Sequence, residues 1–269
     1  PELKRWALGG AEPGQATLLN FYALHTAVLP VMLLFTVAFH FWRIRKASGI
    51  VMLRKPGEAF TGPPTMVRTV PHVVTRELAL AMTVIALLLA VAMVFDAPLA
   101  EQANPGLSPN PTKAPWYVMG IQEILLHVHP VFAVLVAPVL VLAGLVAIPF
   151  LRYDANAAGI WFVSHRGRRL ALASAIAGLV LTVAAVWIDD RFLRASGAAP
   201  ADLVRNGVLP FATVVLACGG WYFALRRVFA ANRNEALQGL FTIILAIFTA
   251  LMLIGIWFRG PGMQLQWAG

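Results

Sequence analysis

The chain has 269 residues, of which 59% are hydrophobic and only 12% are charged. Together with a mean hydropathy of +0.76, this composition excludes an ordinary soluble domain and indicates an integral membrane protein with several spans. The formal net charge is +9, and the basic loops described below account for it without nucleic acid as a partner. The single cysteine, Cys218, rules out an internal disulfide and forms no metal-binding motif.

Residues 1–16 are polar and Gly-rich, which is typical of a loop rather than of a signal peptide. Because the chain begins at Pro1, we expect that its start is missing or that an upstream half was separated from it.

Apolar runs long enough to cross a bilayer recur six times, and they predict an all-α fold, a polytopic bundle of about six transmembrane helices. The predicted spans are Leu18–Trp42, Leu78–Phe95, His127–Phe150, Leu170–Ile188, Val208–Leu225 and Leu237–Trp257.

The first span carries two histidines, His25 and His40, fifteen residues apart. On an α-helix this separation gives a rise of about 22 Å and a rotation of about 60° beyond four turns, so both imidazoles share one broad face. Ionisable side chains inside a spanning helix are costly and need a partner. Imidazole is a common axial ligand of haem iron, which makes haem one candidate partner. Hydrogen bonds to neighbouring helices and a proton pathway are the alternatives.

The loops fall into two sets when the spans alternate across the membrane. Loops 43–76, 152–169 and 226–233 hold fourteen Lys and Arg, whereas the termini and loops 99–117 and 189–206 hold seven. Cytoplasmic loops carry the excess of basic residues, so we expect the first set in the cytoplasm. Both termini then lie on the positive, extracytoplasmic side.

The residues around the histidine pair resemble a known family. Residues 14–30 and the later run His40-Phe41 with Ile44-Arg45-Lys46 are similar to the fourth helix of cytochrome b6, in the cytochrome b family of quinol–cytochrome c and plastocyanin oxidoreductases. The resemblance implies that His25 ligates the haem b near the positive side and His40 the haem b near the negative side. The second ligand of each haem would come from a helix that this chain does not contain. The family often has arginine where this chain has Asn20.

The second span follows a segment with three polar side chains, His72, Arg76 and Glu77. It resembles the cytochrome b segment in which a proline is followed six residues later by an acid at the negative-side quinone site. Reduction of a quinone consumes two protons, and a carboxylate or histidine at the membrane edge can relay them. The alternative is that Glu77 only stabilises a helix N-terminus.

A Pro-rich loop leads from residues 103–105 to Pro115-Trp116-Tyr117. Such a loop with aromatic residues is also typical of an interfacial anchor. It resembles the subunit IV segment of cytochrome b6f in which an Ala-Asn-Pro stretch leads to a Pro-Glu-Trp-Tyr motif that lines the quinol-oxidising pocket. The resemblance therefore implies a quinone-binding role for Pro115, Trp116 and Tyr117.

The glutamate of that motif is absent, because Pro115 directly precedes Trp116. Glu123 lies seven residues after Trp116, about two helical turns, and we expect it on the same face as the substitute catalytic base. His127 and His129 are alternative proton relays, or hydrogen-bonding residues without a role in catalysis.

The resemblance covers residues 8–190 and implies four parts. They are a haem-ligating part (1–43), a cytoplasmic loop (44–76), a subunit IV-like region (77–190) and two additional helices (191–269) that we expect to serve packing or lipid shielding.

The resemblance implies that the chain is the C-terminal half of a diheme cytochrome b, an enzyme subunit that moves electrons from quinol through two haem b groups, coupled to proton translocation. The implied partners are an N-terminal cytochrome b half, a Rieske-type iron–sulfur protein and a c-type cytochrome, in a dimeric multi-subunit complex of a bacterial inner membrane. Two other classes stay open: a haem b anchor of another respiratory or photosynthetic enzyme, and a haem-free transporter whose histidines face a water path.

Overall fold

The computed structural model describes residues 2–12, 14–47, 67–96, 109–154, 161–162, 164–193 and 202–266. These residues are almost entirely helical, and the one extended feature within them is an isolated antiparallel bridge between Arg259 and Leu265. The predicted all-α class is therefore confirmed. Parts of the predicted loops 44–76, 99–117, 152–169 and 189–206 lie outside the described residues, as do the Ala-Asn-Pro residues 103–105.

Six helices in the described residues are long and apolar enough to cross a membrane, which confirms the predicted number of spans. They are Gln15–Lys46, Thr69–Val94, Phe132–Phe150, His165–Phe192, Val204–Arg227 and Arg233–Trp257.

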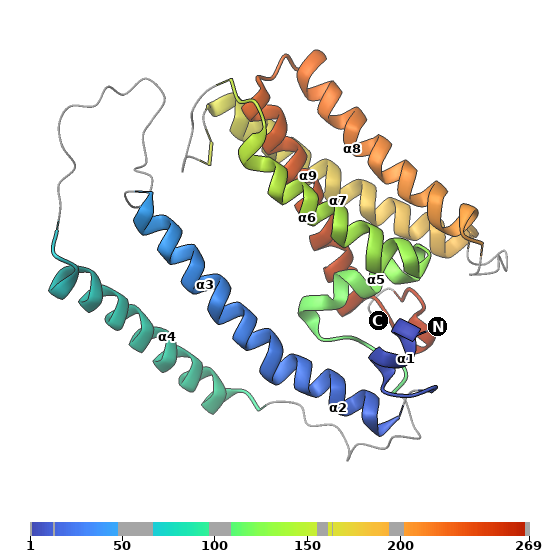
Figure 1. The fold of residues 1–269 in the computed structure, drawn as a ribbon. Helices are drawn as coiled ribbons and strands as arrows, with labels where there is room; N and C mark the ends of the chain where they lie inside the picture. The colour runs from blue at the N-terminus through green and yellow to red at the C-terminus, as the bar shows by residue number, and fades with distance from the viewer. Residues whose placement is uncertain are drawn as a thin grey trace. The chain divides into compact units, whose positions relative to one another are not determined.

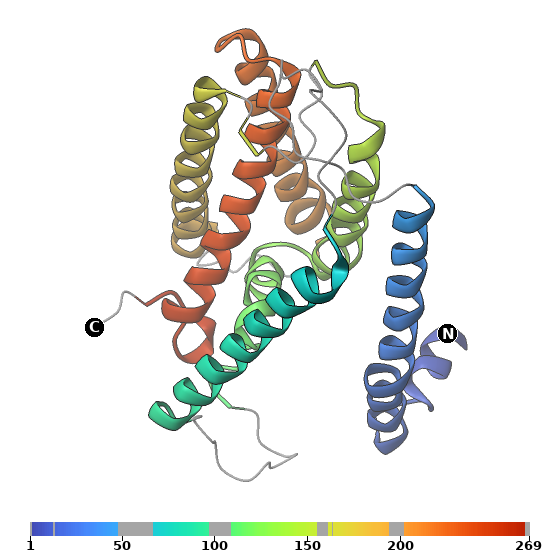
Figure 2. The same ribbon diagram turned by 90° about the vertical axis from the view of Figure 1, so that its left-hand side faces the viewer.

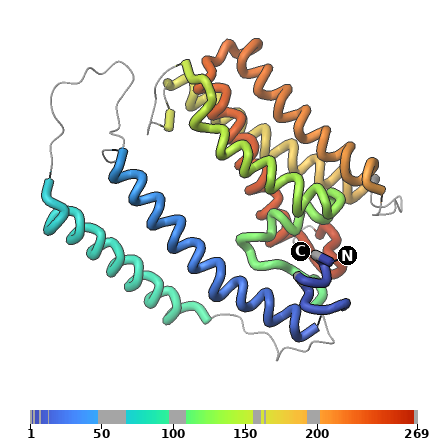
Figure 3. Tube along the Cα trace, in the orientation of Figure 1, coloured from blue at the N-terminus to red at the C-terminus, as the bar shows by residue number. Residues whose placement is uncertain are grey.

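The chain divides into two compact units, residues 1–54 and residues 55–269. The first unit contains α1 (Glu2–Leu8), α2 (Gln15–Ala23), a π-helical turn η1 (Leu24–Val28) and α3 (Leu29–Lys46). The last three form one continuous helical path, traced in Figure 3. Thr17 fixes the turn before it, because its hydroxyl donates to the Leu8 carbonyl over 2.6 Å and accepts from the Gly14 N–H over 3.0 Å.

Proline shapes three of the spanning helices in the same way. A π-helical turn begins six residues before Pro30, Pro138 and Pro210 and ends two residues before each. In each helix the residue before the proline donates its N–H to the carbonyl five residues back. Proline has no N–H and its ring clashes with the carbonyl four residues back, so one widened turn relieves the clash.

The second unit is built around α9. Its elements are η2 (Thr69–Val73), α4 (Val74–Val94), η3 (Trp116–Val118), α5 (Met119–His127), η4 (Phe132–Val136), α6 (Ala137–Ala147), η5 (Ile148–Phe150), α7 (His165–Ile188), η6 (Asp189–Leu193), η8 (Val204–Val208), α8 (Leu209–Arg227), α9 (Arg233–Trp257) and η9 (Pro261–Met263). Helix α9 packs against α7, α5 and α8, and it runs beside α7 in both views (Figure 1 and Figure 2).

Small residues bring α7 and α9 close together. A Cβ atom on Gly178 of α7 would lie only 2.8 Å from the Ile243 carbonyl oxygen and 2.9 Å from the Ala246 Cβ. In membranes, close approach of this kind replaces the hydrophobic effect as the force between helices. Ser174 adds a polar contact, because its buried hydroxyl accepts a hydrogen bond from the Trp221 indole N–H of α8 over 2.9 Å.

Two helix N-termini share one buried carboxylate, that of Glu235. The Ser164 hydroxyl caps α7 by accepting from the Gly167 N–H over 2.8 Å and donates to Glu235 Oε1 over 2.5 Å. In α9 the Asn232 side chain and Glu235 form a reciprocal capping box. These bonds fix one end of the α7–α9 pair.

The third span begins at Phe132, so the predicted start at His127 is wrong. His127 instead ends the short helix α5, and the backbone at Val128 is extended. Pro130 explains the break, because a proline disfavours the α-helical conformation in the residue before it.

The π turns η4 and η8 lie next to each other. The rings of Phe132 and Phe211 are 5.4 Å apart between centroids, and the His129 N–H donates to the Asn206 carbonyl over 2.7 Å. The His129 ring accepts the Val131 N–H over 3.3 Å, so this histidine caps the third span.

Candidate functional site

The first candidate site is the histidine pair in the helix Gln15–Lys46. Both His25 and His40 are exposed on this helix, and in the described residues neither imidazole forms a hydrogen bond or an ion pair. Thr26 and Thr36, which lie between the two histidines, donate to carbonyls of their own helix, over 2.8 Å each. Two exposed imidazoles without hydrogen bonds among the described residues fit the predicted role of axial haem ligands.

The π turn η1 contains His25 and changes the angle between the two histidines. A π turn holds one extra residue, so the fifteen steps to His40 act as about fourteen α-helical steps. The rotation becomes about 40° short of four turns instead of about 60° beyond them, and the rise becomes about 21 Å. The histidines thus still share one broad face, as predicted.

The second candidate site is the start of α4. His72 lies in η2, and Glu77 lies in the first turn of α4 with Arg76 beside it. All three side chains are exposed. The position of Glu77 agrees with a helix N-terminus stabilised by an acid, and it also leaves the three polar groups at one end of this span.

The third candidate site is the segment 109–118, which is held from two sides. The Gln122 side chain of α5 accepts the Ala114 N–H and donates to the Thr112 carbonyl, each over 2.7 Å. Lys113 Nζ donates to the Ile256 carbonyl at the end of α9 over 2.8 Å. These contacts fix the backbone just before Trp116 and Tyr117, whose exposed rings lie edge to face with centroids 5.7 Å apart.

A buried ion pair joins α5 to the segment after α9. The Glu123 side chain is 0% exposed, and Arg259 is 3% exposed. Arg259 Nε lies 3.0 Å from Glu123 Oε1 and 3.1 Å from Oε2, and Nη2 also donates to Oε1. A buried charge is tolerated only when it is paired and hydrogen-bonded, and here each group satisfies the other.

Two aspartates from the end of α7 complete this charge cluster, which we define as Glu123, His127, Asp189, Asp190 and Arg259. His127 Nδ1 lies 2.5 Å from Asp189 Oδ2, and Nε2 lies 3.1 Å from Glu123 Oε1. Arg259 Nη1 donates to Asp190 and, over 3.1 Å, to the Met263 carbonyl. Three segments far apart in the sequence thus meet at one end of the bundle.

The charge cluster shifts the pKa of its members in opposite directions. Burial opposes the charged form of both groups, but the hydrogen bonds outweigh it. The pKa of Glu123 is lowered from 4.5, because His127 and Arg259 donate to it. The pKa of His127 is raised from 6.5, because Asp189 and Glu123 accept from it. The hydrogen bonds therefore favour the ionised form of Glu123 and the charged form of His127.

His127, Asp189 and Asp190 are also close enough together to ligate a metal ion. Arg259 already donates to Asp190, and His127 already bonds to Asp189. The guanidinium supplies the positive charge that a cation would bring, so the charge cluster is complete as an ion-pair network.

Glu123 differs in exposure from the aromatic residues with which it was expected to share a face. Trp116 is 66% exposed and Tyr117 is 63% exposed, whereas Glu123 is fully buried. The 3₁₀ turn η3 carries the two aromatic residues, and α5 carries Glu123. The shared face and the role of Glu123 as a base stay predictions.

Sequence reasoning missed four residues of this region. Arg259, Asp189, Asp190 and Gln122 make its ion pairs and its backbone clamp. One signal was available, because the predicted topology places Glu123, the Asp189-Asp190 pair and Arg259 at the same membrane surface. An arginine directly after an apolar span and near three acids is a candidate ion-pair partner.

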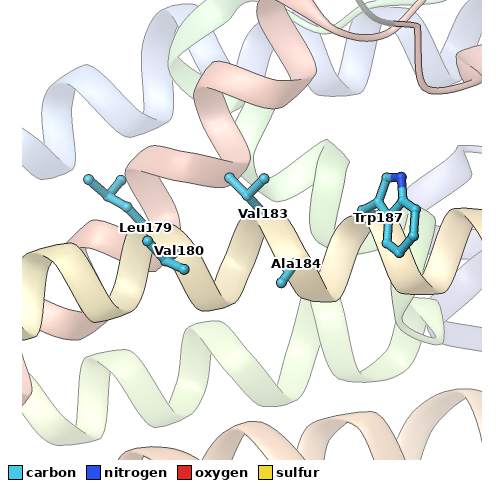
Figure 4. A pocket seen from close by; sticks show the side chains of 5 residues that line it. All are labelled: Leu179, Val180, Val183, Ala184 and Trp187. Atoms are coloured by element: carbon cyan, nitrogen blue, oxygen red, sulfur yellow. The ribbon is translucent and has the colours of Figure 1, made fainter.

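An apolar groove on the surface of α7 is lined by Leu179, Val180, Val183, Ala184 and Trp187 (Figure 4). All five side chains come from this one helix, and the groove contains none of the charged residues described above. Its lining is typical of a surface that faces lipid acyl chains.

Among the comparisons with known proteins, one family model matches the first part of the chain. Residues 1–111 match the family model described as "Cytochrome b(N-terminal)/b6/petB". The matched range includes His25, His40 and the whole of α4. No curated protein and no solved structure matched the chain.

Proposed function

Residues 1–111 of this chain belong to the cytochrome b/b6 family, and from this premise we propose that the chain is the membrane cytochrome b subunit of a quinol-oxidising complex of the bc type. The observation that carries the proposal is the pair His25 and His40 on one membrane-spanning helix inside the matched range. The chain is an integral membrane protein by its six spans, and its family implies haem b.

In this proposal His25 and His40 each supply one imidazole to a haem b, and an N-terminal cytochrome b half supplies the second ligand of each. When bound, haem b accepts and donates single electrons. The role of this chain is then to fix the two imidazoles about 21 Å apart along one helix, near opposite membrane surfaces.

We place quinol oxidation beside Pro115, Trp116 and Tyr117. Oxidation of a quinol to a quinone releases two electrons and two protons, and the electrons would go one to a Rieske-type iron–sulfur protein and one to a haem b. The clamp formed by Gln122 supports this role, because it holds the segment rigidly while the two aromatic rings stay exposed to a ligand.

The protons need an acceptor near this segment, and the charge cluster supplies it. Glu123 was expected to be the base, and we now assign it the role of holding His127 by their 3.1 Å contact. His127 in its neutral form takes one of the two protons and passes it toward Asp189, whose side chain is 22% exposed to solvent, before it can take the second. Glu123 thus acts together with His127 rather than alone.

Quinone reduction would take place near His72, Arg76 and Glu77, which lie exposed at the start of α4. These groups can relay the two protons that reduction consumes. A c-type cytochrome would receive electrons from the iron–sulfur protein in a dimeric assembly. The basic loops favour a bacterial inner membrane with both termini on the positive side.

A reduced-minus-oxidised visible spectrum with a redox titration of the purified complex tests the proposal. We expect two b-type components, and the loss of one of them in His25→Ala and of the other in His40→Ala. His165→Ala is the matched control, because His165 is exposed in the first turn of α7, outside the family match. This control should keep both components.

The other outcomes separate the alternatives. Two components without sensitivity to inhibitors of the positive-side quinol pocket would favour a haem b anchor of another complex. Absence of any b-type signal would overturn the proposal and return the histidines to structural or transport roles.

A further inference from the structure

A second hollow in the second unit lies at the turn between α8 and α9. Tyr222, Phe223, Arg226, Arg227 and Arg233 line it. This site shares no residue with the charge cluster, with the histidine pair or with the polar residues at the start of α4. It combines three guanidinium groups with two aromatic rings.

The three arginines lie where two spans meet one membrane surface. One span ends at Arg227 and the next begins at Arg233, with only five residues between them. The two aromatic residues lie about one turn earlier in α8, which places them about 6 Å deeper along that helix. Basic groups therefore stand at headgroup depth, and the rings stand beside the upper part of the acyl chains.

Acidic residues neutralise only part of this charge. Asp154 lies 3.7 Å from Arg226 Nη1 and 3.7 Å from Arg233 Nε, and its Oδ2 accepts the Arg233 N–H over 2.7 Å. Arg226 Nη1 also donates to the Ala231 carbonyl over 2.8 Å. In the part of the chain that the structure describes, Arg227 has no partner for its guanidinium, so three positive charges face one negative charge.

The fixed arginines lower the entropic cost of binding an anion here. Arg226 is held by two contacts, and Arg233 is held next to the same carboxylate. Side chains that are ordered before binding lose less freedom when a ligand arrives. Planar guanidinium groups bind phosphate oxygens with paired hydrogen bonds, and the exposed Arg227 completes the set.

We propose that this pocket is a binding site for an anionic phospholipid. Its phosphate would contact Arg226, Arg227 and Arg233, and its acyl chains would lie along α8 against Tyr222 and Phe223. A soluble phosphate ester offers the same oxygens, but it has no apolar portion to cover Phe223, which is 64% exposed. The position of the aromatic residues beside the acyl chains therefore favours a phospholipid over a soluble phosphate ester.

The test uses the full chain, purified with its complex, in nanodiscs of phosphatidylcholine that contain a minor fraction of phosphatidylglycerol. Native mass spectrometry counts the phosphatidylglycerol retained on the protein after release from the nanodisc. Arg227→Gln should lower the apparent affinity about fivefold, because one basic group near anionic lipid contributes that much. Asp154→Asn should raise the affinity, since it keeps the oxygen that accepts the Arg233 N–H and removes the competing charge.

Arg168→Gln is the matched control. Arg168 is exposed in the first turn of α7. This turn lies at the same end of the bundle as Glu235 and the start of α9, but Arg168 does not line the pocket. Equal losses in Arg168→Gln and Arg227→Gln would show a general surface-charge effect and overturn the proposal. Displacement of phosphatidylglycerol by millimolar inorganic phosphate would also overturn it, because the site would then select a soluble anion.

Discussion

At the scale of single residues, the Glu123–Arg259 pair has the largest expected effect on stability. Arg259→Met leaves the Glu123 carboxylate buried without its guanidinium partner and with only the 3.1 Å contact to His127, which costs about 3–5 kcal/mol of unfolding free energy. The double variant Glu123→Leu with Arg259→Met removes both charges and should recover most of that loss. Denaturation of the detergent-solubilised protein measures both variants.

Arg205→Met serves as the control for this experiment, because Arg205 lies near the same membrane surface and is exposed. Its replacement should change the unfolding free energy by no more than about 0.5 kcal/mol. A double variant that is as unstable as Arg259→Met would contradict the assignment of the cost to an unpaired charge.

His127 and Glu123 also predict how stability depends on pH. The pKa of His127 is raised from 6.5, so its contribution is fully present below that value and is lost as the pH rises through the folded-state pKa. The pKa of Glu123 is lowered from 4.5, so its contribution is present above that value and is lost as the pH falls through the folded-state pKa. We therefore expect stability to decline on both sides of the window from 4.5 to 6.5.

Thermal unfolding across this pH range measures the effect. In His127→Gln the decline on the alkaline side should become weaker, while the decline on the acidic side stays. A variant with an unchanged alkaline decline would show that another group causes it.

At the scale of the helical element, the π turn before Pro30 sets the orientation of His25. Pro30→Ala restores a backbone N–H at the position where the helix lacks one, so a regular α-helix becomes possible. Loss of the extra residue in η1 rotates His25 by about 100° relative to His40. We expect the visible band assigned to the His25 haem to shift or weaken, with the other band unchanged.

Pro138→Ala is the matched control, because it removes the equivalent proline from the third span. It should leave both haem bands in place. If Pro30→Ala also left both bands and their potentials unchanged, the π turn would have no role in placing His25.

The lengths of the apolar runs were enough to predict all six spans, since a bilayer demands about 20 apolar residues in each helix. The break before Phe132 was readable in principle from Pro130, which follows directly after His129. The Glu123–Arg259 pair was not readable from local patterns, because 136 residues separate its partners. Such an ion pair depends on which helices pack against each other. The spacing of apolar residues along the sequence does not indicate which helices are neighbours.

At the scale of the whole molecule, the asymmetry of basic residues predicts a definite orientation. In a Cys218→Ser background, a cysteine at Lys113 should react with a membrane-impermeant reagent added to intact spheroplasts. A cysteine at Arg168 should react only after the membrane is permeabilised. Reaction of both positions in intact spheroplasts, or the reverse pattern, would contradict the predicted topology.

The second of the two additional helices makes polar contacts at its ends as well as packing contacts. Helix α9 contacts α5, α7 and α8, and the segment after it supplies Arg259 and the carbonyl that holds Lys113. The interior of this span is free of charge, and its polar contacts lie at its ends.

The adjacent π turns η4 and η8 have a mechanical consequence. Each helix lacks a backbone bond at its proline, so its resistance to bending is lowest there. The contact between Phe132 and Phe211 joins the two helices near these weak points, so we expect a bend in one of them to affect the other. The opposite end of α7 and α9 is stiffened by the bonds of Glu235. We therefore expect the bundle to bend more easily near the charge cluster than at the end that Glu235 holds.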